Sequence, residues 1–588
     1  MQIALVLFLL SLAVVFFILE IISVDLVALL LMIAFVTFRI LTPEEAFAGL
    51  SNDVIIFFGG LFVLTAALLR TGVINYIGQR IIRFGGTNPW RLLGVMMLLV
   101  AGVSSFLSNL ATVAIFLPIA LGASQKARIH ESKLLIPVAY ASILGGTCTL
   151  VGTSTNIIMN GILQKYDLPA FSLFEFTPLG ILITVTGLLY LLFVGIRWLP
   201  ERQVESLSEE YHLREYVTEV MVLPDSPLIG KTLAECAFST ELDLNVLSII
   251  RGNRYILAPR TYETIREGDR LLLEGRIESI LKLKAEEGLE IKGEALMSDQ
   301  DLESEDIKLM EILIPPRSKL IGENLKGLNF RPRYGLTVLA IYRHGETLRD
   351  KLSRIRLASG DILLTQGHRD SLLLLRQDPD FMVLGEVEGR SYRKKRAVYA
   401  LSIFALSLLV GSLQMVPFSI AMLSGAILTI LTKCVTLKEA YDSIDWKTLV
   451  LVAGLLSAGV AMEKTGTARF LSDQLLSLMG SPKPMLTLLL LFLLTMLLSQ
   501  PLSNAAAAAL VAPIAFNLAT QMNVNPRAFM VTVTMAASCS FMTPLEPACL
   551  LVYGPGKYTF LDFFKVGFPL TLLVLLMVVM MVPIFWPL

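Results

Sequence analysis

A polar Ser-Asn pair at the end of a long apolar run occurs twice in this chain. The copy that begins at Ser108 reads SNLATVAIFLPIA, and the copy that begins at Ser503 reads SNAAAAALVAPIA. Ser, Asn, Pro, Ile and Ala recur in the same register, and another serine, Ser104 or Ser499, lies four residues before each pair. Polar interruptions of apolar helices are tolerated at membrane depth only where they are buried in protein or line a cavity. Paired interruptions in two internal repeats are typical of transporter binding sites.

The composition predicts a polytopic α-helical membrane protein. Of the 588 residues, 55% are hydrophobic and 17% are charged, against about 25% charged in a soluble chain. The net charge of zero implies no nucleic-acid partner. No basic region precedes the first apolar run, so we expect an uncleaved helix there. Expected spans are 3–19, 22–40, 53–70, 90–107, 133–161, 173–197, 397–413, 418–432, 447–463, 483–500, 508–521, 527–553 and 563–586.

Each half carries a second interrupted helix. In the first half, Gly145-Gly146 and the polar run GTSTN at 152–156 interrupt residues 140–161. The counterpart begins at Met535 and reads MAASCSFMTPLEPACLLVYGPG. The runs TGVINYIGQRIIR, from Thr71, and TGTARFLSDQLLSL, after Lys464, are typical of helices at the membrane interface. We therefore predict two transmembrane repeats, 1–199 and 391–588, that are inverted and contain re-entrant hairpins.

Residues 200–395 differ from the rest, because they are rich in charge and alternate as strands do. They contain their own repeat at a constant offset of 92: LIG at 228 matches LIG at 320, and Gly-Asp at 268 matches Gly-Asp at 360. Hydrophobic runs that are bounded by such turns are typical of strands. We predict two small α+β domains, at 200–296 and 297–390.

Basic residues flank this insert on both sides. Arg197 and Arg202 precede it, and a cluster follows it at Arg390, Arg393, Lys394, Lys395 and Arg396. The positive-inside rule then places residues 200–395 in the cytoplasm of a multi-pass protein of the plasma (inner) membrane.

Together, these motifs resemble the divalent anion/sodium symporter family. The resemblance rests on the paired Ser-Asn hairpins, the segment GGT…GTxxN and the run VYGPGxYxFxDF from Val552, and it covers nearly the whole chain. The insert resembles two TrkA-C (RCK-C) domains, and the combination is similar to a branch linked to sulfate. The resemblance implies sodium symport of sulfate or carboxylates, inverted repeats, a homodimer and an elevator motion. It also implies a small-molecule or nucleotide ligand for the cytoplasmic domains.

The anion chemistry can be read from the residues themselves. A dianion needs N–H and O–H donors and a positive potential, and the N-terminus of a half-helix supplies both. Asn109 and Asn504 each add an amide donor. The expected substrate-binding residues are Ser108, Asn109, Ser503, Asn504, Thr153, Ser154 and Thr543.

Sodium, the expected coupling ion, takes oxygen ligands such as hydroxyls, amide carbonyls and unwound backbone carbonyls. Two cages are expected, one in each half, and they share the two asparagines with the anion site. The expected sodium ligands are Ser104, Ser108, Asn109, Gly152 and Asn156 in one half, and Ser499, Ser503, Asn504 and Ser540 in the other.

Two departures from the family pattern bear on the substrate. The family's carboxylate carriers usually have Ser-Asn-Thr at both hairpins, whereas Leu110 and Ala505 follow the asparagines here. With two hydroxyls missing, a smaller tetrahedral anion such as sulfate is favoured. Glu546 is an ionisable residue in an expected intramembrane segment, and such residues are functional candidates by default. It is a candidate coupling residue, and the simpler reading places it at a cavity mouth or beside backbone N–H groups.

Alternatives remain at this stage. Small polar residues at helix crossings often serve only close packing, and Arg251 and Arg343 fit solvated strand positions. The substrate can also be a dicarboxylate. A ligand-gated potassium channel is a further alternative, although no carbonyl filter sequence such as TVGYG occurs. An enzyme is not expected, because the chain has four His residues and no metal-ligand or nucleophile motif.

Overall fold

In the computed structural model the chain forms two compact units. The first consists of Met1–Pro200, Ser391–Val552 and Phe560–Leu588, and the second of Glu201–Arg390 and Tyr553–Thr559. The structure describes residues 2–19, 22–73, 88–127, 129–166, 168–201, 217–233, 235, 236, 238, 244–252, 254–257, 259, 262–274, 289–294, 307–316, 318–343, 346–348, 352–368, 371, 375, 378, 380–384, 396–413, 415–479 and 483–588.

The first unit is helical, and its two halves have the same order of elements. The first half contains α1 (Gln2–Leu19), α2 (Val24–Thr37), α3 (Pro43–Phe47), α4 (Asp53–Thr71), α6 (Pro89–Ser104), α7 (Asn109–Ala127), α8 (Leu135–Gly146), α9 (Ser154–Lys165) and α10 (Thr177–Tyr190). The second half contains α18 (Ala397–Ser412), α19 (Phe418–Leu431), α20 (Leu437–Ser443), α21 (Trp446–Lys464), α22 (Thr467–Met479), α23 (Pro484–Ser499), α24 (Asn504–Gln521), α25 (Pro526–Ser538), α26 (Pro547–Tyr553) and α27 (Phe560–Phe585).

The short helices α3 and α20 begin in the same way. In α3, the Thr42 hydroxyl accepts from the Glu45 N–H, and the Glu45 carboxylate accepts from the Thr42 N–H. Thr436 and Glu439 make the same reciprocal pair at α20. Each capping box satisfies two backbone donors that the helix itself leaves free. The same local sequence chemistry thus starts the same element in both halves.

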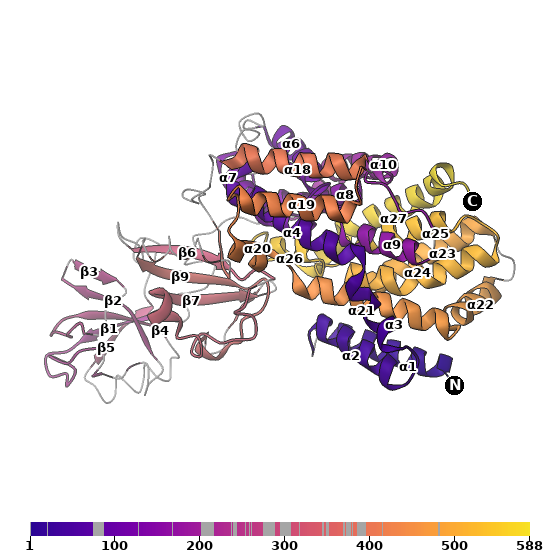
Figure 1. Ribbon diagram of the computed structural model, residues 1–588. Coiled ribbons are helices and arrows are strands. Elements are labelled where there is room, and N and C mark those ends of the chain that lie inside the picture. The colour runs from indigo at the N-terminus through magenta and orange to yellow at the C-terminus, as the bar shows by residue number, and fades with distance from the viewer. Residues whose placement is uncertain are drawn as a thin grey trace. The chain divides into compact units, whose positions relative to one another are not determined.

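Close helix contacts hold the first unit together, as Figure 1 shows for α4 beside α19 and α18. α4 packs on α19, and α21 packs on α2, which is the reciprocal pairing of corresponding helices. Gly60 makes the first contact possible, because a Cβ there would lie 2.7 Å from the Met422 carbonyl carbon. Gly454 does the same at the second, where a Cβ would lie 2.7 Å from the Ala28 Cβ.

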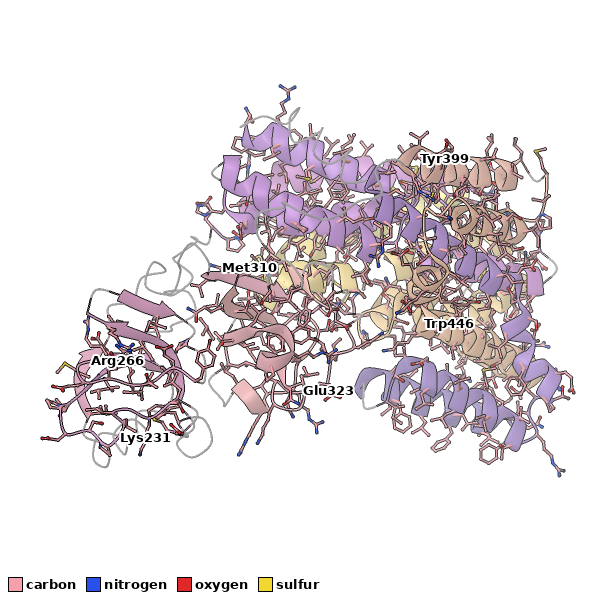
Figure 2. All side chains as sticks on the ribbon, turned by 60° about the vertical axis from the view of Figure 1, so that its left-hand side comes forward. Lys231, Arg266, Met310, Glu323, Tyr399 and Trp446 are labelled. Atoms are coloured by element: carbon pink, nitrogen blue, oxygen red, sulfur yellow. The ribbon has the colours of Figure 1, made fainter. Side chains whose placement is uncertain are left out.

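The outer faces of these helices are apolar. Val398 and Tyr399 of α18, Leu431 of α19 and Trp446 of α21 are all more than half exposed, and Figure 2 labels the two aromatic side chains among them. Exposed apolar surface on this scale fits a lipid environment rather than water. Among the described residues, four helical stretches have the length and composition to cross a membrane: Pro43–Thr71, Thr177–Trp198, Trp446–Lys464 and Phe560–Phe585.

The second unit contains two five-stranded antiparallel sheets, each with its own apolar core. The first has the order β3-β2-β4-β1-β5, and the second has the corresponding order β8-β7-β9-β6-β10. The strands are β1 (Val217–Val222), β2 (Asn245–Arg251), β3 (Arg254–Leu257), β4 (Arg270–Glu274), β5 (Leu289–Glu294), β6 (Ile307–Leu313), β7 (Leu336–Arg343), β8 (Glu346–Thr347), β9 (Ile362–His368) and β10 (Met382–Val383).

Arg251 and Arg343 are not solvated strand residues, as the simplest reading had them. Arg251 donates to both carboxylate oxygens of Asp269, each at 2.8 Å. Arg343 makes the same pair with Asp361, at 2.6 and 2.7 Å. Both aspartates are fully buried, and the bond to Asp269 raises the pKa of Arg251. The Gly-Asp motif therefore supplies the buried half of an ion pair that ties one strand, β2 or β7, to the turn that precedes the next, β4 or β9.

The structure divides two expected spans and leaves other expectations untested. The span at 133–161 consists of α8 and α9, separated by a break at 147–153. The span at 527–553 consists of α25 and α26, separated by a break at 539–546. The run after Lys464 forms α22. Its first-half counterpart, after residue 73, lies outside the described residues, as do Arg202 and the basic cluster before Arg396.

Candidate functional site

Four helix breaks carry the polar residues that the sequence singled out. α6 ends at Ser104 and α7 begins at Asn109, while α23 ends at Ser499 and α24 begins at Asn504. Ser108 and Ser503 cap the second helix of each pair, where their hydroxyls accept from the N–H groups of Ala111 (3.4 Å) and Ala506 (3.2 Å). These two serines satisfy free backbone donors, and both side chains are exposed within the chain.

In the first half, glycines let the break between α8 and α9 pack directly against the break between α6 and α7. A Cβ on Gly146 would lie 2.6 Å from Asn109 Oδ1 and 2.8 Å from Thr153 Cγ2. A Cβ on Gly152 would lie 2.3 Å from the Gly146 carbonyl oxygen. Because no other residue type fits at these distances, the Gly-Gly-Thr…Gly-Thr spacing lets the backbone pass directly beside the Asn109 side chain.

Each asparagine oxygen accepts from a buried serine of its own half. Ser104 Oγ donates to Asn109 Oδ1 at 3.1 Å. In the second half the donor is Ser540 rather than Ser499, the counterpart of Ser104: Ser540 Oγ donates to Asn504 Oδ1 at 3.1 Å and lies 3.1 Å from Ser499 Oγ. Ser104, Ser499 and Ser540 are almost completely buried.

Both asparagines interact with one carboxyl group, that of Glu546. Asn504 Nδ2 donates to Glu546 Oε2 at 3.2 Å, and the Asn109 side chain also interacts with this group. Among the described residues, Glu546 forms no ion pair with a Lys, Arg or His side chain. Two residues that are 395 positions apart in the sequence thus converge on one negative group.

Further polar contacts join the two halves beside this group. Thr153 Oγ1 lies 2.6 Å from Thr155 Oγ1 and 3.4 Å from Ser538 Oγ, and Thr155 also hydrogen-bonds Ser538. The buried Tyr140 hydroxyl donates to the Phe541 carbonyl at 2.6 Å. The breaks of both halves therefore form one cluster.

Asn156 has the strongest geometry for a cation ligand. Its Nδ2 donates to the Thr149 carbonyl at 2.7 Å, which fixes the amide. Its Oδ1 is buried and has no hydrogen-bond partner among the described residues, and the same is true of Thr112 Oγ1, one turn beyond Asn109. An unpaired buried acceptor costs about 1–3 kcal/mol, which a bound cation would offset.

The remaining expected site residues are dispersed around this cluster. Thr543 donates to Gln500 Oε1 at 3.1 Å, and Ser154 is half-buried at the first position of α9. Sequence reasoning missed Thr112, Thr155 and Gln500. Thr112 and Thr155 each lie within a few residues of an expected ligand, and this proximity is the sequence signal that could have identified them.

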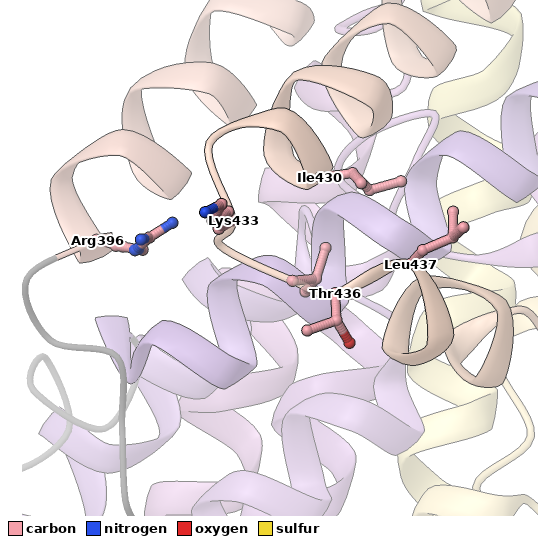
Figure 3. A pocket seen from close by; sticks show the side chains of 6 residues that line it. Arg396, Ile430, Lys433, Thr436 and Leu437 are labelled. Atoms are coloured by element: carbon pink, nitrogen blue, oxygen red, sulfur yellow. The ribbon is translucent and has the colours of Figure 1, made fainter.

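A separate cavity of about 570 Å³ lies where α18 begins and α19 passes into α20. Figure 3 shows the basic side chains of Arg396 and Lys433 at this cavity. Its lining residues are Arg396, Ile430, Lys433, Val435, Thr436 and Leu437, and none of them belongs to the four helix breaks. The cavity is therefore not part of the Ser-Asn site.

Comparison with known proteins identifies the family. Residues 14–536 match the family described as citrate transporter, CitMHS. The chain belongs to the citrate transporter family. This family is related to the divalent anion/sodium symporters, which the motifs resemble.

Relatives that match nearly the whole chain support this assignment. The chain is 39% identical to an uncharacterized transporter of Synechocystis sp., over 98% of this chain and 96% of the relative. It is 33% identical to the uncharacterized transporter YfbS of Escherichia coli, over 99% of both. At 21% identity, it matches sodium/sulfate cotransporter 2 of Chlamydomonas reinhardtii, over 90% of this chain and 83% of the relative.

Proposed function

We propose that this protein is a sodium-coupled symporter of sulfate or a related divalent anion. The observation that carries the proposal is the convergence of Asn109 and Asn504 on the Glu546 carboxylate. This convergence supports an anion site, because the side chains of two separate helix N-termini reach one carboxyl group. The positive ends of α7 and α24 favour negative charge at the same place. The Chlamydomonas relative, named a sodium/sulfate cotransporter, supports this choice of substrate and ion.

In this proposal, sodium binds at the oxygen of each asparagine amide, on the side opposite to the anion. The Asn109 and Asn504 oxygens face buried serine hydroxyls, and Asn156 offers an unpaired oxygen. An asparagine whose nitrogen meets the anion and whose oxygen meets sodium couples the two ligands directly. Two or more sodium ions would also offset the charge of a dianion in a site of low dielectric constant.

The architecture that we propose for this function follows from the resemblance to the divalent anion/sodium symporter family. Inverted repeats 1–199 and 391–588 with re-entrant hairpins would carry the site across the plasma (inner) membrane by an elevator motion, within a homodimer. Residues 200–296 and 297–390 would be cytoplasmic TrkA-C-like domains that regulate transport through a small-molecule or nucleotide ligand. Their two sheets have the same strand order, which supports two copies of one domain.

A carboxylate carrier is the second candidate. The family to which the chain belongs is described as citrate transporter, and the group seated between Asn109 and Asn504 is itself a carboxylate. Competition decides between the two, because excess succinate or citrate would block sulfate uptake only if carboxylates occupy the same site.

The deciding experiment is radiolabelled sulfate uptake into proteoliposomes that hold the purified protein. We expect accumulation under an inward sodium gradient and background uptake when choline replaces sodium. Asn109→Ala and Asn504→Ala should each abolish uptake, because each removes an anion donor and a sodium ligand together. Asn517→Ala is the matched control, since the Asn517 amide only donates to the Pro513 carbonyl within α24. Equal uptake in sodium and choline would contradict the coupling.

A further inference from the structure

The donors of the proposed anion site are already satisfied by the chain itself. Glu546 lies in the break between α25 and α26, within the sequence Pro544-Leu545-Glu546-Pro547. Its carboxyl group accepts from Asn504 Nδ2 at 3.2 Å and interacts with the Asn109 side chain. It therefore occupies the position where the two halves would hold the negative group of a substrate.

The orientation of the asparagines distinguishes this arrangement from a cation site. A carboxylate that served as a cation ligand would be surrounded by other oxygen acceptors. Glu546 instead meets the donor end of the Asn504 amide, while the oxygens of Asn109 and Asn504 accept from Ser104 and Ser540. Among the described residues, Glu546 has no basic ion-pair partner. Its surroundings are those of an anion seat.

We propose that Glu546 is a tethered surrogate for the substrate anion. In the carrier without substrate its carboxylate satisfies Asn109 and Asn504, and an arriving dianion must displace it. The inference rests on the proposed function, because it assigns Glu546 a role within the same anion site.

A symporter needs such a device at one step of its cycle. After it releases its cargo, the empty carrier must return, and buried amide donors without a partner would oppose that passage. Glu546 supplies the partner from within the protein. The same charge repels a dianion at close range, so the surrogate also weakens substrate binding and favours release.

Two assays on the full-length protein separate these effects. Net uptake into substrate-free proteoliposomes requires the empty carrier to return, whereas exchange against internal unlabelled substrate does not. We expect Glu546→Ala to retain exchange and to lower the ratio of net uptake to exchange by about tenfold, the equivalent of one charge-assisted hydrogen bond. The KM for external substrate should fall by a similar factor, because no internal anion competes.

Two further variants make the test specific. Glu546→Gln preserves the size of the side chain but removes its charge, so it should also lower the KM. Glu44→Gln removes an exposed carboxylate from α3, and it should change neither the KM nor the ratio. Thermal unfolding of each purified variant reports whether the protein is folded.

Three results would overturn the inference. An unchanged KM and an unchanged ratio in both Glu546 variants would show that Glu546 does not compete with substrate. A higher sodium concentration for half-maximal uptake at constant substrate KM would show a cation ligand instead. Loss of exchange together with net uptake in well-folded protein would show that Glu546 is required for binding. Failure of the proposed function is a different result, since the wild-type protein would then transport neither sulfate nor carboxylates.

Discussion

Each asparagine of the Ser-Asn pairs performs two tasks that no other residue type combines at this length. Its oxygen accepts from Ser104 or Ser540, and its nitrogen is a donor, which Asn504 directs to Glu546. Aspartate would offer no donor, and serine or threonine has a single polar atom for both tasks. The residue type itself therefore fits the proposed site, in which an anion binds on one side and a cation on the other.

Asn156→Ala should weaken sodium binding without removing the anion seat. The substitution deletes the unpaired, buried Oδ1, and a contact from this atom to a cation is worth about 1.5–3 kcal/mol. We expect the sodium concentration for half-maximal uptake to rise by about tenfold or more, with a smaller change in substrate KM. Uptake measured across a sodium titration checks this expectation.

Asn160→Ala is the control for this prediction, on the same helix and one turn further. The Asn160 oxygen accepts from the Phe171 N–H at 2.5 Å, so it holds a loop and is not free to bind an ion. This variant should lower thermal stability and leave the sodium dependence unchanged. An equal rise in the sodium concentration for half-maximal uptake in both variants would contradict the assignment of Asn156 as a sodium ligand.

At this scale, the sequence singled out candidate residues, and the structure adds the bonds between them. The paired Ser-Asn motifs and Asn156 could be singled out, because polar residues at the end of apolar runs are rare and their register repeats. That Glu546 would lie between Asn109 and Asn504 was not predictable, because the contact depends on how two breaks in different halves fold together. Neighbouring backbone N–H groups were the simpler expectation for Glu546, and the structure gives it side-chain amides instead.

At the scale of secondary-structure elements, the broken helices depend on glycines, which let another segment of the same chain pass at close range. α8 ends at Gly146, directly beside the Asn109 side chain and the Thr153 cap of α9. Any Cβ at this position must displace one of them. The interruption is therefore a packing requirement as well as a loss of helical hydrogen bonds.

Gly146→Ala should consequently reduce transport strongly. The new Cβ would approach Asn109 Oδ1 to 2.6 Å, so the amide must rotate away from both of its partners. Gly102→Ala is the matched control on α6, because nothing lies within 4 Å of the position of its Cβ. It should retain transport and stabilise the helix by up to about 1 kcal/mol. Uptake and thermal unfolding of both variants check this, and wild-type transport by Gly146→Ala would contradict it.

The second unit shows what repetition in a sequence can and cannot reveal about elements. The offset of 92 aligned Arg251 with Arg343 and one Gly-Asp motif with the next. The same offset holds for the ion pairs to Asp269 and Asp361. The bonds themselves could not be read, because Gly-Asp is equally typical of an exposed turn, and burial of the aspartate depends on strand pairing.

For the whole molecule, the helices of the first unit fall into two sets. In one set α4 packs on α19, α2 packs on α21, and α4 contacts α21; in the other α6 packs on α8, and α9, α24 and α25 pack on one another. The sets meet where α21 contacts α24 and where α4 contacts α9. If the breaks travel together across the membrane, this boundary is where sliding must occur.

One ion pair crosses that boundary at the end of α9. Lys165 Nζ lies 3.0 Å from Glu463 Oε2 of α21, and the neighbouring Tyr166 ring stacks on Phe516 of α24, with ring centroids 3.8 Å apart. A second pair, Lys464 with Glu45, joins α21 to α3 at 2.6 Å. The first pair connects the two sets of helices, whereas the second lies within one set.

This contrast tests the elevator motion directly. Lys165→Cys combined with Glu463→Cys, joined by a short cleavable thiol cross-linker, should reduce uptake to background, because a covalent link prevents α9 from moving past α21. Cleavage of the linker should restore uptake. The matched pair Glu45→Cys and Lys464→Cys should transport normally when cross-linked, because α3 and α21 remain together. The single-cysteine variants control for modification alone. Full transport with the 165–463 link in place would exclude relative movement at this boundary and would require the site to open by local motion of the breaks.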